Sequence, residues 1–164
     1  MRVLVSGASK YGSTAEVAEA IGTELRARGI EAEVLEPTQV ASLEDFDAAV
    51  LGSAVYIGHW LDSAKDLVQR HREALRQRPV WFFSVGPIGE PPTPAEEPVD
   101  IAPLLEATGA REHQIFAGRL DRSRLSFVEK ALVIALRAPE GDFRDWDEIR
   151  EWARSIASAL GGSE

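Results

Sequence analysis

Residues 3–14 read VLVSGASKYGST. The apolar run at residues 3–5 predicts a short buried strand, which Ser6 and Gly7 close. A helix is predicted from Ser13 to about Arg28, because apolar side chains follow at four-residue spacing. These side chains are Val17, Ile21 and Leu25. A buried strand that leads through a short loop into an amphipathic helix indicates a chain in which strands and helices alternate.

The same alternation continues to the end of the chain. Further strands are predicted at residues 31–35, 48–51, 80–85 and 114–117. Further helical segments are predicted as a turn around Leu43 and as helices at 62–77, 100–108 and 145–160, the last capped by Asp145. Apolar strands that alternate with helices imply a parallel sheet covered on both faces. We therefore predict an α/β fold with a doubly wound, five-stranded parallel sheet of order 2-1-3-4-5.

Composition limits the possible functions. The chain has 164 residues and a net charge of −9, which argues against nonspecific binding to nucleic acid. It has no cysteine, and its three histidines are far apart, so neither a thiol nucleophile nor a metal site is predicted. No signal peptide and no membrane-spanning run is recognisable, which predicts a cytoplasmic protein. The length predicts a single domain over residues 1–164.

Ligands of doubly wound sheets bind beyond the carboxyl ends of the strands, at the switch point between strands 1 and 3. The first loop there contains Ser9, Lys10, Tyr11, Gly12, Ser13 and Thr14. Its hydroxyl groups and the N–H groups of the following helix start are suited to a phosphate. Ordinary capping of that helix is the alternative. A nucleotide-binding P-loop is excluded, because Ser13 occupies the position of the required lysine.

Two further loops follow predicted strands at the same edge. The loop after the third strand offers Ala54, Val55, Tyr56, Ile57 and Gly58. Tyr56 and Trp60 are predicted to stack on a flat ligand, with Gly52 and Gly58 allowing close approach. The alternative is a loop held against the core by its aromatic side chains.

The loop after the fourth strand offers Ser84, Val85, Gly86, Pro87, Ile88 and Gly89. Its backbone groups are suited to the polar edge of a heterocycle. An ordinary surface loop stiffened by prolines is the alternative.

Together these three loops resemble the flavodoxin family. The family's phosphate loop has the form [ST]-x-T-G-x-T, which residues 9–14 match except at Tyr11. Within the family, residues 116–121 and the pair Asp145-Trp146 are most similar to the flavodoxin-like menaquinone-dependent protoporphyrinogen oxidases. The resemblance implies FMN as cofactor and two-electron chemistry on a small organic substrate. It also implies a quinone or a redox protein as electron acceptor, and no catalytic side chain is predicted.

An insert at about residues 120–143 does not belong to a minimal five-stranded sheet. Its stretch from Leu125 to Leu136 is apolar nearly all round, and residues 119–137 carry five basic and two acidic side chains. The stretch is suited to peripheral contact with the inner face of an anionic membrane or to covering the cofactor. A core helix, or a helix at a homodimer interface, is the preferred alternative.

Two other functions remain open at this point. A flavodoxin-like electron carrier would have the same loops, although it has no evident need for the apolar insert. A binding module without cofactor is favoured only by Tyr11 in the phosphate loop. A short-chain dehydrogenase is excluded by the lack of a Tyr-x-x-x-Lys motif, and a response regulator by Gly52 where strand 3 should end in aspartate.

Overall fold

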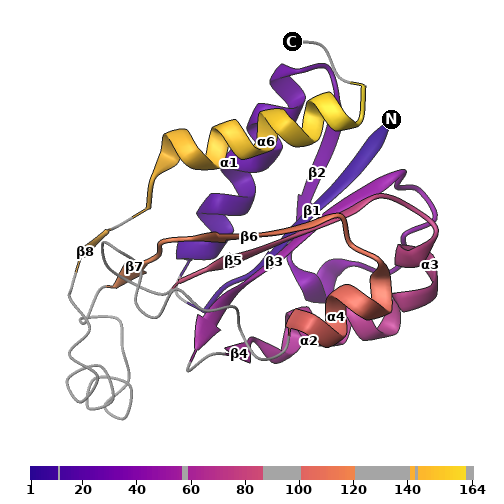
Figure 1. The fold of residues 1–164 in the computed structure, drawn as a ribbon, viewed down its shortest axis with the longest axis horizontal. Coiled ribbons are helices and arrows are strands. Elements are labelled where there is room, and N and C mark those ends of the chain that lie inside the picture. The colour runs from indigo at the N-terminus through magenta and orange to yellow at the C-terminus, as the bar shows by residue number, and fades with distance from the viewer. Residues whose placement is uncertain (11, 57–58, 87–100, 121–140, 143, 162–164) are drawn as a thin grey trace.

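The computed structural model describes residues 1–10, 12–56, 59–86, 101–120, 141–142 and 144–161. Five parallel strands form the main sheet in the order β2-β1-β3-β5-β6 (Figure 1). They are β1 (Arg2–Ala8), β2 (Glu31–Leu35), β3 (Ala48–Tyr56), β5 (Val80–Val85) and β6 (Glu112–Phe116). The two-residue strand β4 (His59–Trp60) pairs antiparallel with the end of β3. Apart from that added strand, the predicted order 2-1-3-4-5 is confirmed.

Helices cover both faces of the sheet (Figure 1). One face carries α1 (Ser13–Ala27) and α6 (Trp146–Ala159), and the other carries α2 (Asp62–Arg70), α3 (Arg72–Arg76) and α4 (Ile101–Thr108). Successive side chains of a strand point to opposite faces, so each strand feeds two cores. Val3 and Val5 pack in the core with α1 and α6, whereas Leu4 packs in the core with α2. This double burial explains why the strands read as continuous apolar runs.

One helical prediction needs correction. The helix expected over 62–77 is interrupted at His71, whose backbone angles of φ −112° and ψ 21° are not helical. A turn is present at Leu43, as predicted, with Phe46 N donating to the Leu43 carbonyl over 3.0 Å. A separate 3-10 turn, η1 (Pro37–Gln39), precedes it. Pro37 favours the start of that turn because its ring fixes φ, and Glu36 and Gln39 cap it reciprocally.

The ring of Phe83 is accommodated by two glycines that pair across neighbouring strands. Gly7 of β1 lies opposite Gly52 of β3. A Cβ atom on Gly52 would lie 2.4 Å from the Phe83 ring, and one on Gly7 would lie 3.3 Å from it. The prediction that Gly52 allows close approach of a ligand is wrong, because the core ring of Phe83 occupies that space.

The chain between β6 and α6 begins and ends in a small antiparallel ladder. Strand β7 (Arg119–Leu120) pairs with β8 (Gly141–Asp142). The stretch from Leu125 to Leu136, singled out for membrane or subunit contact, lies outside the described residues. Among the helices that the structure describes, none is long and apolar enough to cross a membrane.

Candidate functional site

Three of the predicted loop segments lie side by side at one edge of the sheet. Strand β3 is hydrogen-bonded to β1 on one side and to β5 on the other, with Ala8 opposite Ser53 and Ala54 opposite Val85. The carboxyl ends of these three strands therefore meet at one edge (Figure 1). Of the predicted site residues, Tyr11, Ile57, Gly58 and the range 87–89 lie outside the described residues.

The segment after β1 forms a tight turn into α1. Gly12 has φ 88°, a left-handed conformation that favours glycine, and its N–H group donates to Ser9 Oγ over 2.9 Å. The carbonyl of Gly12 then accepts from Glu16 N over 3.0 Å and closes the first turn of the helix. This geometry directs the N–H groups of the first helical residues toward the loop, where a helix has no partners of its own for them.

The side chains of this turn differ in their surroundings. Thr14 is buried, and the buried Ser13 Oγ has no hydrogen-bond partner among the described residues. Lys10 is exposed. A buried hydroxyl without a partner is uncommon and favours a ligand that would complete it. The residues at the start of α1 therefore fit an anionic group such as a phosphate.

Trp60 does not take the position predicted for it. Its side chain is 2% exposed and packs edge-on against Phe82, with ring centroids 5.3 Å apart. The prediction that Trp60 stacks on a ligand was wrong, and for this residue the alternative of a loop held to the core by an aromatic holds. Burying the apolar indole in the core under β3 and β5 is more favourable in free energy than packing it against a half-exposed ligand.

Two buried serines hold the β3–β4 hairpin in place. Ser84 Oγ accepts from Trp60 Nε1 over 2.8 Å and lies 2.7 Å from His113 Nε2. Ser53 Oγ accepts from the backbone of Leu61 over 2.9 Å. Ser84 was predicted as a binding residue, but its hydroxyl is buried and engaged within the protein. The supporting roles of Ser53 and His113 were not predicted, because both depend on contacts with residues distant in the sequence.

Replacing Ser84 with alanine is expected to lower the free energy of unfolding by about 1–3 kcal/mol, because the buried Trp60 N–H would lose its partner. Urea unfolding of both proteins measures the difference. Ser155 offers a matched control: it is an exposed residue of α6, and its hydroxyl donates to the Trp152 carbonyl over 2.6 Å. Ser155→Ala should leave stability nearly unchanged, and an equal loss in both variants would contradict the role given to Ser84.

The segment after β5 approaches the end of β6 closely. Val85 is buried, and Gly86 has φ 113° while its N–H group donates to the Phe116 carbonyl over 2.8 Å. A Cβ atom on Gly118 would lie 3.4 Å from the Gly86 nitrogen. Glycine at both positions lets the backbones pack together and keeps this edge free of side chains.

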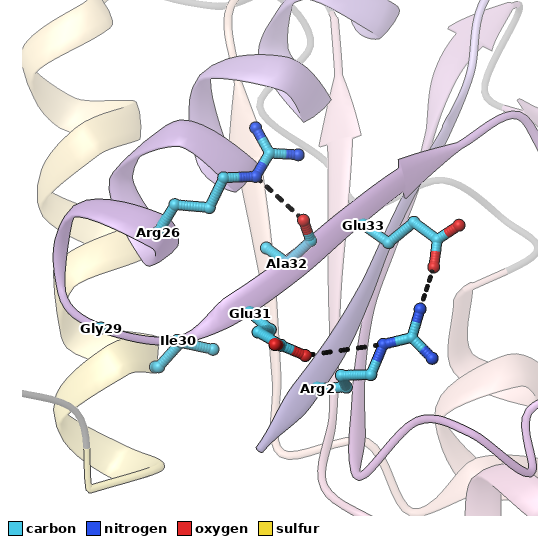
Figure 2. Close-up of a pocket in the computed structure, with 7 residues that line it drawn as sticks. All are labelled: Arg2, Arg26, Gly29, Ile30, Glu31, Ala32 and Glu33. Atoms are coloured by element: carbon cyan, nitrogen blue, oxygen red, sulfur yellow. Dashed lines mark hydrogen bonds and ion pairs between the residues drawn. The ribbon is translucent and has the colours of Figure 1, made fainter.

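An open hollow lies at the opposite, amino end of the sheet, where β1 and β2 begin (Figure 2). Its charged side chains are already paired within the protein. Arg26 Nε donates to the Ala32 carbonyl over 2.9 Å, and Arg2 Nη2 donates to Glu33 over 2.6 Å. The hollow offers no convergent polar groups for a ligand, so the carboxyl edge remains the candidate site.

Comparison with known proteins identifies the family of the chain. The model of the flavodoxin domain family matches residues 4–147. The protoporphyrinogen IX dehydrogenase [quinone] of Escherichia coli K12 is 25% identical over 172 residues, covering 96% of this chain and 95% of the relative.

Solved flavodoxins share the fold. A flavodoxin from the domain Archaea superposes with a TM-score of 0.68 at 19% identity, covering 98% of this chain and 99% of the other. A cysteine-to-alanine variant of a flavodoxin from Pseudomonas aeruginosa superposes with a TM-score of 0.60 at 22% identity, covering 99% of this chain and 100% of the other.

Proposed function

Because this chain belongs to the flavodoxin domain family, we propose that it binds FMN at the carboxyl edge of β1, β3 and β5. The observation that carries the proposal is the start of α1, where the buried Ser13 Oγ lacks a partner among the described residues, beside the N–H groups of the helix start. The hydroxyl groups of Ser9 and Ser13 would hold the phosphate. The backbone at residues 54–58 and 84–89 would hold the ring.

We further propose that the protein is an oxidoreductase that takes electrons from a reduced tetrapyrrole of the protoporphyrinogen type and passes them to a quinone. Similarity to the E. coli dehydrogenase over nearly the full length of both chains supports this substrate class. Each turnover would remove two electrons and two protons from the substrate and convert one quinone to the quinol. Bound FMN supplies this redox chemistry, while the protein positions it and limits access of water.

The protein residues have positioning roles in this scheme. Ser53 and Ser84 hold the β3–β4 hairpin through Leu61 and Trp60, and so fix the carboxyl end of β3. Gly86 keeps the end of β5 free of a side chain. No described side chain is assigned a proton-transfer step.

Transfer of electrons between proteins is the second candidate function. Superposition with flavodoxins over nearly the whole chain favours it. The β7–β8 ladder favours the oxidoreductase, because it brackets a 20-residue segment, 121–140, for which a simple carrier has no evident need.

We expect purified protein to retain FMN through desalting and to show the absorbance of a protein-bound flavin. A protein that stays colourless after incubation with FMN would overturn both redox functions. If the flavin is retained, an assay of protoporphyrinogen IX oxidation with a menaquinone analogue distinguishes the oxidoreductase from the electron carrier. The oxidoreductase should consume one quinone for every two electrons removed from the substrate. A flavin-loaded protein that leaves the tetrapyrrole unchanged would support the carrier.

A further inference from the structure

Arg144 lies between β8 and α6, and its side chain is only 3% exposed. By contrast, the side chains of Arg150 and Arg154, two arginines within α6, are 44% and 48% exposed. Burying a guanidinium costs free energy unless its N–H groups are paired with acceptors. The partners of Arg144 therefore indicate its role. No sequence motif pointed to this residue.

The partners of Arg144 come from the two segments that it joins. Its Nε and Nη2 atoms donate to the two oxygens of Asp142, over 2.8 and 2.7 Å. Its Nη1 atom donates to Glu16 Oε2 over 2.7 Å and to the Ser13 carbonyl over 3.3 Å. The guanidinium also lies 4.6 Å from the ring centroid of Trp146. Arg144 therefore joins β8 to the first turn of α1, 128 residues earlier in the chain.

Two carboxylates consequently lie near the start of α1, which is also where a phosphate would bind. Negative charge at that point opposes an anion through simple repulsion, even though the helix start itself attracts one. Hydrogen bonding to Asp142, and secondarily to Glu16, raises the pKa of the Arg144 guanidinium, so this side chain stays charged. Its charge offsets one carboxylate, and its fork geometry holds both.

We propose that Arg144 is a positioning residue for the phosphate subsite: it holds Glu16 and Asp142 in place, offsets one of their two negative charges, and thereby favours a dianionic phosphate at the start of α1. The inference rests on the proposed binding of FMN and adds a residue from the far end of the chain to that site. Arg144 acts through its carboxylate partners and is not assigned contact with the phosphate.

The test compares FMN with riboflavin, which has the same ring and no phosphate. Both affinities are measured by flavin fluorescence at low ionic strength, where charge effects are largest. Arg144→Met keeps an apolar chain of similar length on Trp146 and removes the charge. We expect it to weaken FMN binding by about 10-fold or more, with riboflavin changed by less than about 3-fold.

A second substitution separates charge from structural loosening. The double variant Arg144→Met with Glu16→Gln removes one of the two carboxylates that Arg144→Met leaves without their cation. Its FMN affinity should therefore be about 2- to 5-fold higher than that of Arg144→Met alone. A merely structural clamp would show no such recovery. Arg154→Met is the matched control, because Arg154 also ties α6 to α1, through Glu24 over 2.8 Å. It should leave both affinities unchanged.

The outcomes are distinguishable. Wild-type protein that binds neither flavin overturns the proposed function and this inference with it. Wild-type protein that binds FMN, with Arg144→Met unchanged or equally weakened for both flavins, overturns the inference alone. Should Arg144→Met fail to fold, Glu16→Gln by itself decides, since the proposal requires tighter FMN binding with riboflavin unchanged. An FMN affinity that does not rise overturns it.

Discussion

Replacing Gly52 with alanine is expected to destabilise the protein by about 3 kcal/mol or more, the upper part of the range for overpacked cores. The added Cβ would lie 2.4–2.5 Å from three atoms of the Phe83 ring. The ring is fully buried, and Phe116 and Trp152 pack against it with ring centroids 6.5 and 6.1 Å away, so moving it would disturb the core. For a domain of this size, the melting temperature should fall by roughly 6–12 °C.

Two controls make the Gly52 result specific. Gly109, unlike Gly52, has a left-handed backbone with φ 65°, and a Cβ there would meet nothing within 4 Å. Gly109→Ala should cost only about 1–2 kcal/mol of backbone strain. Combining Gly52→Ala with Phe83→Leu should be much less damaging than the sum of the two single changes, because the shorter side chain removes the clash. A Gly52→Ala protein within about 1 kcal/mol of wild type would contradict the packing described here.

Replacing Ser9 with aspartate is expected to weaken FMN binding by about 100-fold, because it places a full negative charge in the turn that would hold the phosphate. The fold should survive. Ser9 Oγ accepts the Gly12 N–H over 2.9 Å, and a carboxylate oxygen can take over that hydrogen bond in a similar turn. Riboflavin affinity should stay nearly constant, because riboflavin carries no phosphate.

Ser9→Asn is the matched neutral variant, since asparagine has nearly the shape of aspartate and also accepts from the backbone. The ratio of FMN affinities between Ser9→Asn and Ser9→Asp isolates the effect of charge. Equal FMN affinities in the two variants would mean that the phosphate binds elsewhere. Equal losses for FMN and riboflavin would instead indicate that the turn itself had changed shape.

Local sequence patterns were sufficient to predict most of the secondary structure. The helix predicted from Ser13 ends as expected before Gly29, which has φ 82°. Asp145 caps the last helix by accepting the Glu148 N–H over 3.1 Å, as its position predicted. Both helix ends depend on residues close together in the sequence: the first on the backbone preference of a glycine, the second on one hydrogen bond to a capping side chain.

The direction of side chains at the site was harder to predict. Trp60 and Gly52 both lie at the predicted switch point, and the sequence favoured a ligand for each of them. In the structure their neighbours are Phe82 and Phe83, which lie more than 20 positions away along the chain. Composition cannot tell whether an aromatic residue in a loop faces a ligand or the core, because that depends on what a neighbouring strand places beside it.

The order of strands and helices, the parallel sheet and the position of the turn into α1 were determined by the sequence itself. Each follows from hydrophobic periodicity, from turn residues and from the way alternating strands and helices pack. Only the tertiary structure decided that Ser84 supports Trp60 and that Arg144 lies buried against Glu16. The physical reason is that these contacts join residues 24 and 128 positions apart, whose meeting depends on how the whole sheet and its helices pack.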